Sequence, residues 1–361
     1  MTIALTGAFA LTPVGDSAAS TCAAIRANIG GFREHPWLTT LGQDPKWDPP
    51  EPLRAAWVPT IDPFEAGRER LMLLALSALT AGTAALRLRR RDLARTAVLL
   101  ALAEPDPALD GLDLPSFGGE LLAKAGITAI GPATVSRLGR PGTLELIGHA
   151  ASLFATGQAD AALVLAVDSY LDHPRIKACD DARRLRSSRV KDGLLPGEAA
   201  ALLLFEPYPA GPRRQDDPER RAPLALVEAP SAANETQPIM SMRTSTGAGL
   251  CDAIRGALAP LGPDATAPWV LSDMTGEGYG AFEWGVTRTR LSAAVGAARL
   301  DHPAESIGDV GAAASAILLA CAAHGFARDK AAPDRALILS SSDGPLRAAV
   351  IARRPPPAET R

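Results

Sequence analysis

The chain has 361 residues, of which 47% are hydrophobic and only 4% aromatic. A chain of this length and composition can bury a large core, which excludes general disorder and argues against modules that stack bases on aromatic side chains. Lys and Arg number 37 against 40 acidic residues, a net charge of −3. No overall field therefore attracts nucleic acid or an anionic membrane, and we expect neither as a partner.

The four cysteines, Cys22, Cys179, Cys251 and Cys321, are widely scattered and form no CxxC pair. This usage fits neither a disulfide framework nor a zinc site. Three of them lie in Ala-rich segments with helical patterns and are predicted to be small core residues, whereas Cys179 falls in a predicted polar loop. The chain also lacks phosphate-binding, dinucleotide-binding and HExxH motifs, so we expect no metal and no cofactor.

The chain starts without the basic residues and cleavage site of a signal peptide. Its longest apolar run, residues 71–86, is interrupted by polar residues and glycine and is short for a membrane span. The sequence therefore predicts a cytoplasmic protein in which this run is a buried helix.

Apolar runs and breaker residues divide the first half of the chain into elements of alternating type. In chain order they are a strand at 2–6, a helix ending near 28, an irregular Pro-, Trp- and charge-rich stretch at 33–63, a helix at 63–90, a buried strand at 97–103, a loop at 104–118, a helix at 141–156, and strands at 161–167 and 199–205.

Residues 206–222 are Pro-rich, charged and without periodicity, which makes them the best boundary in the chain. The predicted organisation is an N-terminal half (1–205), this linker (206–222) and a C-terminal half (223–355). The elements expected after the boundary are helices at 244–261, 280–297 and 311–324, and strands at 269–272, 335–339 and 346–352.

The two halves repeat one pattern. Each has a helix that is apolar almost all round (142–156 and 311–324), then a strand ending near an aspartate, then a terminal apolar strand. Helices that are apolar all round need a cover on both sides. The fold class predicted from this duplication is α/β, with five αβαβα layers built from two duplicated halves.

Five segments in order resemble the β-ketoacyl synthase branch of the thiolase-like superfamily. They are residues 3–32, 156–170 (TGQADAALVLAVDSY), 191–206 (KDGLLPGEAAALLLFE), 307–315 (IGDVGAAAS) and 339–352 (LSSSDGPLRAAVIA). The resemblance covers nearly the whole chain and implies the same five-layer fold. It also implies an acyltransferase ancestry and a dimer formed by joining sheets edge to edge, although residues 104–140 look shortened.

The resemblance also indicates where condensing enzymes carry a nucleophilic Cys, two His and a Lys. The Cys position falls on Arg140, within one residue, so Gly139 and Pro141 are the alternatives. The two His positions fall on Asp273 and Asp309, and the Lys position falls on Ala304. The resemblance therefore implies that no catalytic residue of the set remains.

A guanidinium and two carboxylates at these positions carry complementary charge, and an Arg matches a carboxylate through its planar fork. Two buried carboxylates without a partner would be costly. We therefore expect Arg140 to pair with Asp273 or Asp309; the alternative is that Arg140 lies in a solvent-facing loop.

Three functions remain open at the level of sequence. The first is an inactive binding, adaptor or chaperone protein, such as an accessory to a bacterial secretion effector. The second is a non-catalytic partner subunit of a ketosynthase, similar to chain-length factors, against which the shortened 104–140 region counts. The third is an acyltransferase that uses other residues. The sequence favours the first, with a protein partner and a homodimer expected.

Overall fold

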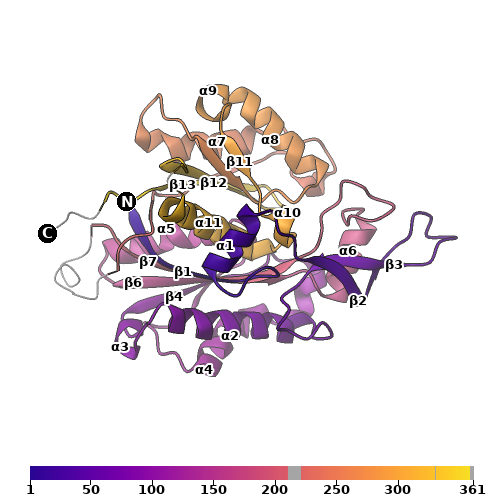
Figure 1. Cartoon of the computed structure of the whole chain (residues 1–361), viewed down its shortest axis with the longest axis horizontal. Helices are drawn as coiled ribbons and strands as arrows, with labels where there is room; N and C mark the ends of the chain where they lie inside the picture. Colours follow the sequence, from indigo (N-terminus) through magenta and orange to yellow (C-terminus); the bar gives the residue numbers. More distant parts are fainter. Residues whose placement is uncertain (210–220, 330, 358–361) are drawn as a thin grey trace.

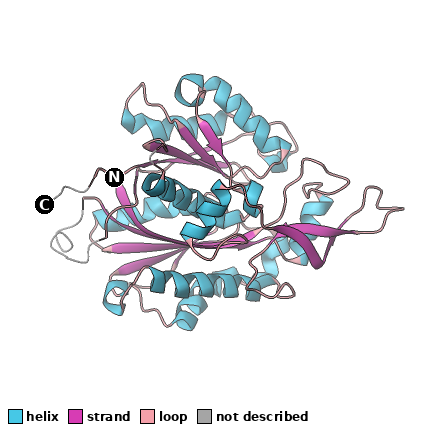
Figure 2. Cartoon of the chain, viewed as in Figure 1, coloured by secondary structure: helices cyan, strands magenta, loops and turns pink. Residues whose placement is uncertain are grey.

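A computed structural model describes residues 1–209, 221–329 and 331–357. Figure 1 shows five layers. Helices α7 (Ala248–Leu258) and α8 (Gly278–Arg290) cover one part of the sheet. Helices α5 (Gly142–Ala155) and α11 (Ala314–Arg328) lie between its two parts, and α2 (Gly67–Ala85) and α4 (Leu114–Ala125) cover the other part. Figure 2 shows the same alternation of helices and strands. The structure thus confirms the predicted five-layer α/β architecture.

Helices and strands alternate along most of the chain. The helices are α1 (Ala18–Arg26), α2 (Gly67–Ala85), α3 (Arg90–Leu93), α4 (Leu114–Ala125), α5 (Gly142–Ala155), α6 (His173–Asp181), α7 (Ala248–Leu258), α8 (Gly278–Arg290), α9 (Ser292–Val295), α10 (Ala304–Ile307) and α11 (Ala314–Arg328). The strands are β1 (Ile3–Leu11), β2 (Phe32–Thr40), β3 (Glu51–Ala56), β4 (Thr96–Ala101), β5 (Thr134–Ser136), β6 (Ala161–Ser169), β7 (Glu198–Pro207), β8 (Ala225–Val227), β9 (Ser231–Asn234), β10 (Trp269–Ser272), β11 (Arg299–Asp301), β12 (Arg335–Ser341) and β13 (Leu346–Arg353).

The strand order shows the duplication directly. Within the described residues, eleven strands form one sheet whose main path is β11-β10-β12-β13-β8-β1-β7-β6-β4-β5, with β9 on β13. The first half reads β5-β4-β6-β7-β1 and the second reads β11-β10-β12-β13-β8. In each half two parallel pairings lead to an antiparallel pair, β6 with β7 and β12 with β13. The junction is β8, which pairs with both β1 and β13.

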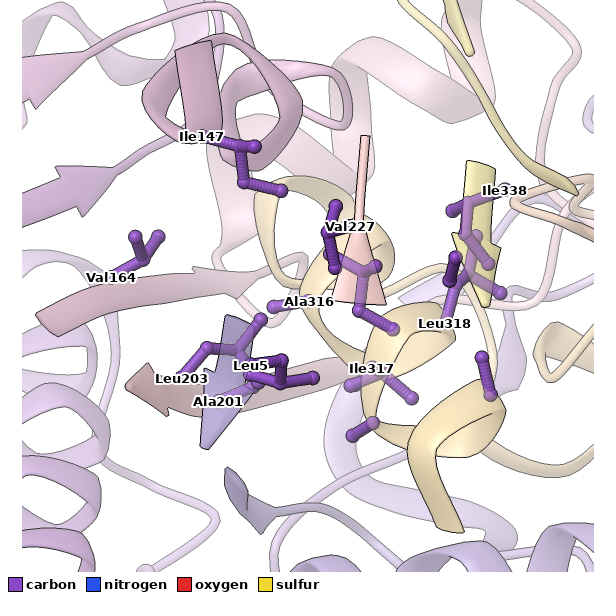
Figure 3. Close-up of a cluster of buried hydrophobic side chains, with 14 of the residues drawn as sticks. Leu5, Ile147, Val164, Ala201, Leu203, Val227, Ala316, Ile317, Leu318 and Ile338 are labelled. Carbon is purple, nitrogen blue, oxygen red and sulfur yellow. The ribbon is translucent and has the colours of Figure 1, made fainter. Parts of the chain in front are cut away.

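The core lies where α5 and α11 meet the two parts of the sheet. Every residue of β6 is buried, as expected for a strand covered on both faces. Figure 3 shows side chains from both halves packing together here, among them Ile147 of α5, Val164 of β6, Ile317 of α11 and Ile338 of β12. Among the described residues, one helical segment, Gly311–Arg328, is long and apolar enough to cross a membrane, and 83% of it is buried inside the protein.

Several sequence expectations were wrong in detail. The stretch 33–63 is not wholly irregular, because β2 and β3 pair in a hairpin that projects from the body in Figure 1. Alternating exposure and several charges hid these strands from a search for apolar runs. The segment 104–118 contains a 3-10 turn at Pro107–Leu112 and the start of α4. Helix α2 is shorter than predicted, and the helix expected at 280–297 is divided into α8 and α9.

The predicted linker 206–222 is mostly outside the described residues, which end at 209 and resume at 221. The first two residues of the predicted linker, Glu206 and Pro207, are the last two residues of β7. The other predicted strands and the two apolar central helices are confirmed within a few residues.

Candidate functional site

Arg140 stands immediately before the N-terminus of α5, the helix between the two parts of the sheet. Pro141 caps that helix with backbone dihedrals already in the helical region, and Gly139 makes the preceding turn at a φ of 63°. A Cβ on Gly139 would lie 2.7 Å from Cγ of Glu104, so both φ and space favour glycine there. The turn aims the Arg140 side chain inward, and the residue is only 7% exposed.

Asp309 is the main partner of Arg140. The Nε of Arg140 donates to Oδ1 at 3.2 Å, and Nη2 donates to Oδ2 in a second, shorter bond. Nη2 also contacts the Tyr170 hydroxyl at 3.2 Å. The structure therefore places Arg140 in a buried ion pair and not in a solvent-facing loop, and it selects Asp309 over Asp273 as the partner.

The backbone around Asp309 fixes its carboxylate. Asp309 forms an isolated β-bridge with Pro196. The Asp309 N–H donates to the Leu195 carbonyl at 2.8 Å, and the Asp309 carbonyl accepts from the Gly197 N–H at 2.9 Å. Its Oδ1 also accepts from the Gly311 N–H at 2.9 Å. These contacts join the segment before α11 to the segment before β7, so both halves of the chain hold the carboxylate in place.

The pair continues into a longer network of alternating charge. Nη1 of Arg140 donates to Oδ1 of Asp343 at 2.9 Å. Arg184 donates to both carboxylate oxygens of Asp343, at 2.6 and 3.1 Å, and also to both oxygens of Glu277, at 2.8 and 3.0 Å. The order Asp309–Arg140–Asp343–Arg184–Glu277 thus links loops from both halves, with each arginine between two carboxylates.

The charges set the pKa values of this network. Burial opposes the charge on Arg140, but Asp309, Tyr170 and Asp343 outweigh it and hold the arginine pKa well above its usual value. Burial alone would raise the pKa values of Asp309 and Asp343, yet the positive charge of Arg140 lowers both, with Arg184 adding to the effect on Asp343. All three groups are therefore charged at neutral pH.

Asp273 lies close by but has different partners. Its Oδ2 accepts from the Ser340 hydroxyl at 2.9 Å and from the Ser341 N–H at 2.8 Å, at the end of β12. Burial raises the pKa of Asp273 to about 6, and the charge of Arg140 and the two hydrogen bonds offset only part of that rise. Asp273 is thus a carboxyl group that titrates just below neutral pH.

The four positions given by the resemblance, Arg140, Asp273, Asp309 and Ala304, surround two small cavities. Ala304 opens α10 and lines a cavity of about 20 Å³ with Asp273 and Asp309. Arg140 and Asp273 line a second cavity of about 50 Å³. The structure therefore brings all four positions to the walls of these two cavities.

A larger cavity of about 490 Å³ adjoins this cluster at Arg140 and Asp343. Glu104, Tyr170 and Cys179 also line it. Burial, with Asp343 adding to it, raises the pKa of Glu104. Because Arg140 and Asp343 line both this cavity and the 50 Å³ one, their ion pair separates the two.

Cys179 is buried on α6 and does not lie in a loop, so the sequence-based expectation for it was wrong. Burial raises the pKa of its thiol to about 11, and the charges of Arg184 and Arg175 lower it only in part. The thiol is therefore protonated near neutral pH and a poor nucleophile. In the described part of the chain, no group of three or more His, Cys, Asp or Glu side chains is arranged to hold a metal ion.

The sequence patterns did not assign four residues to this cluster: Arg184, Asp343, Glu277 and Glu104. Asp343 carried a usable signal, because it follows a buried strand in the same way that Asp168 follows the apolar run of β6. Arg184 lies in a run of basic residues with no pattern that points inward. Its role depends on the fold of the segment after α6 and could not be seen in the sequence.

No family model matches the chain, and no curated protein matches its sequence. Solved structures do match over nearly its full length. The ishigamide ketosynthase/chain length factor has a TM-score of 0.72 at 20% identity, covering 98% of this chain and 99% of that one. The structure of a type II polyketide acyl-carrier protein in complex with its ketosynthase, bound to the hexaketide, gives 0.77 at 16% identity, covering 98% and 99%.

A ketosynthase from module 6 of the bacillaene synthase of Bacillus subtilis gives a TM-score of 0.78 at 13% identity, covering 99% of this chain and 73% of that chain. At sequence identities of 13% to 20%, these matches show a shared architecture. Together with the strand order and the central helices, they establish that this chain has the thiolase-like fold of ketosynthases and chain length factors.

Proposed function

We propose that this protein is a ketosynthase-like subunit that has no condensation nucleophile of its own and acts as the non-catalytic partner of an intact ketosynthase. One observation carries the proposal: Arg140, held by Asp309 and Asp343, occupies the start of α5, where the resemblance to condensing enzymes calls for a cysteine. A helix N-terminus lowers the pKa of a thiol, and an arginine there offers no nucleophile.

The other replaced positions support the same reading. Asp273 and Asp309 stand where the resemblance calls for histidines, and Ala304 stands where it calls for lysine. Two carboxylates next to a developing enolate oxygen would repel its charge instead of stabilising it. The buried Cys179 thiol has a raised pKa and is not a natural substitute for the missing nucleophile.

The comparisons favour a partner subunit over a free-standing adaptor. One of the similar structures is described as a ketosynthase/chain length factor, and this chain spans 99% of it. The apparent shortening at 104–140 counted against a partner subunit. The match nevertheless covers 98% of this chain and 99% of the ketosynthase/chain length factor chain, so the two are similar in length. A role as an accessory to a secretion effector has no comparable support.

The geometry offers an edge for a partner. Strand β5 is the last strand on its side of the sheet and pairs only with β4 in the described residues. Beside it, α5 leaves Glu145, Gly148, His149 and Ser152 exposed on one face. An unpaired strand edge beside an exposed helix face can join a second subunit, which would hide the edge.

Purification of the tagged full-length protein from its own cells, followed by identification of bound proteins, tests the proposal. We expect a ketosynthase that keeps its Cys and His residues, at one copy per copy of this chain. A homodimer that carries no ketosynthase, or a complex with an effector protein alone, would contradict the proposal. Retention in the cytoplasmic fraction is expected in either case.

A further inference from the structure

Two cysteines from distant parts of the sequence lie against each other in the core. The Sγ of Cys22, on α1, is 3.7 Å from the Sγ of Cys321, on α11. Cys22 is buried, and Cys321 keeps part of its surface exposed. Cys22 belongs to the hydrophobic cluster that contains the central helices, and Cys321 packs against it. Cys179 packs in a separate cluster around α6, and Cys251 lies on α7. Among the four cysteines, the structure brings together only this pair.

The separation is short enough for a covalent bond after a small movement. A disulfide has a sulfur–sulfur distance of about 2.05 Å, so the gap of 3.7 Å must close by about 1.7 Å. Rotation of the two side chains about their Cα–Cβ bonds moves the sulfur atoms without requiring the helices to separate. The Cys22–Cys321 pair therefore meets the first requirement of a disulfide site, which is proximity.

The pair is also accessible to a small molecule. Cys22 and Cys321 both line a cavity of about 170 Å³ that is distinct from the cavities around Arg140. Asp301 and His324 line the same cavity. A molecule the size of hydrogen peroxide fits a volume that would hold several waters.

We propose that Cys22 and Cys321 form a reversible thiol–disulfide site, oxidised by a small peroxide and reduced by a dithiol. In the first step the Cys321 sulfur attacks one peroxide oxygen, the O–O bond breaks, and a sulfenic acid and water form. In the second step the Cys22 sulfur attacks the sulfenic sulfur, the S–O bond breaks, and a second water leaves. Two thiols are oxidised, one peroxide is reduced to two waters, and no further oxidant is needed.

The more exposed thiol is the natural first reactant, which assigns the attack to Cys321. Its hydrogen bond with Cys22, together with burial, holds the pKa of Cys321 well above its usual value. Cys321 is thus a neutral thiol at rest, and its oxidation is slow unless peroxide is in excess. Reduction by dithiothreitol proceeds by thiol–disulfide exchange and restores the pair.

The bond would tie α1 to the helix that supports the Arg140 site. Ser315, on the first turn of α11, donates to the carbonyl of Arg140 at 2.6 Å. A cross-link between residues so far apart in sequence restricts the unfolded chain strongly, which stabilises the native state. We therefore expect the oxidised protein to have a higher melting temperature than the reduced protein.

The test uses the reduced full-length protein, treated with excess hydrogen peroxide and then mapped by mass spectrometry. We expect loss of two hydrogen masses, a cross-linked peptide pair that contains Cys22 and Cys321, and full reversal by dithiothreitol. Peptide mapping of the wild-type chain needs no variant, so the result does not depend on a variant that folds. Absence of this cross-link, or irreversible sulfinic and sulfonic acids on separate cysteines, would overturn the proposal.

Two variants sharpen the test. C22S should abolish the cross-link and leave a sulfenic acid on Cys321, which dimedone traps. C251S, a change at a buried cysteine on α7, should form the Cys22–Cys321 bond as the wild type does. Equal cross-linking in C22S and C251S would contradict the assignment. Neither result depends on the proposed partner-subunit role.

Discussion

Arg140 and Asp309 are 169 positions apart in sequence, and their side chains form a double hydrogen bond in the interior. Arg140 comes from the first half of the chain and Asp309 from the second. Their pair joins the start of one central helix to the turn before the other. The resemblance places a catalytic Cys at the position of Arg140 and a catalytic His at that of Asp309, so one ion pair occupies both positions.

Removing the positive charge of this pair should be strongly destabilising. In R140M, the carboxylates of Asp309 and Asp343 lose their shared cation, and Asp309 remains buried without a counter-charge. Breaking a buried ion pair costs about 3 kcal/mol or more. Urea denaturation monitored by circular dichroism should show this decrease in unfolding free energy.

Two comparisons separate this effect from a general loss of charge. R95M removes an arginine from an exposed pair with Asp160 and should leave the melting temperature nearly unchanged. The double variant R140M/D309N should recover part of the lost stability, because one uncompensated carboxylate is gone. An unchanged melting temperature in R140M would show that the ion pair does not stabilise the fold.

Asp273 should make stability depend on pH. Its pKa is about 6 in the native protein, above the value near 3.9 expected in the unfolded chain. Between about pH 4 and 6 the native state therefore holds one more proton than the unfolded state, and stability falls as the pH rises through this window. D273N removes that penalty and should be more stable than the wild type at pH 7.5, but not at pH 4.

The unfolding free energy of D273N at pH 7.5 should exceed that of the wild type by about 2 kcal/mol. This is less than the full pKa difference would give, because Asp273 is only partly buried. Urea titrations of both proteins at the two pH values measure it. D252N, on the exposed side of α7, controls for removing one negative charge. A gain for D273N that is the same at both pH values would show that titration of Asp273 is not its cause.

Gly311 should tolerate no side chain. A Cβ at this position would lie 1.9 Å from Oδ2 of Asp168, and the backbone has a φ of 49°. That carboxylate accepts from the Ala312 N–H at 2.8 Å and pairs with Arg175, so it cannot simply move away. We expect G311A to lower the melting temperature and to cost about 1–3 kcal/mol.

The matched change is G285A, inside α8, where nothing lies within 4 Å of the new Cβ. Alanine is the better helix former, so this variant should be stabilised by about 0.5–1 kcal/mol. Differential scanning calorimetry of the two variants compares them directly. Similar melting temperatures for G311A and the wild type would contradict the close packing of Gly311 on Asp168.

The proposed subunit edge can be tested with a second pair of glycines. Gly148 lies on the exposed face of α5 beside β5, and Gly285 lies on the exposed face of α8. At both positions an added Cβ would have no neighbouring atom within 4 Å, so glutamate fits both sites in the isolated chain. G148E should weaken association by placing a charge in the interface, whereas G285E should not. Light scattering and co-purification measure both, and equal association of the two variants would exclude the α5 face as the interface.

The sequence predicted the duplicated halves, most of the buried strands and both central helices, because these elements are long apolar runs. It also predicted that Arg140 pairs with an aspartate, from the complementary charges at the positions that the resemblance indicated. The choice of Asp309 over Asp273 was not predictable, since it depends on the bridge between Asp309 and Pro196. The β2–β3 hairpin was missed for the opposite reason: its residues alternate in exposure and carry charges and prolines.

Helix α6 shows a further limit. Its sequence, HPRIKACDD, is polar, and only one face is buried, so it looked like a loop. Cys179 was consequently placed in the wrong kind of surroundings. Arg184, just beyond this helix, became part of the central network only through the turn that follows α6. Roles that depend on such turns are not visible in composition or periodicity.

Covalent acylation tests most directly whether this chain lacks a condensation nucleophile. The full-length protein is incubated with excess acyl-carrier protein carrying an acyl chain, and with acyl-coenzyme A, beside an intact ketosynthase as a positive control. Intact-mass spectrometry then measures the mass of each protein in the mixture. We predict an acyl adduct on the control ketosynthase and an unchanged mass for this protein. A stoichiometric acyl adduct on this chain, on Cys179 or any other residue, would contradict the proposed non-catalytic role.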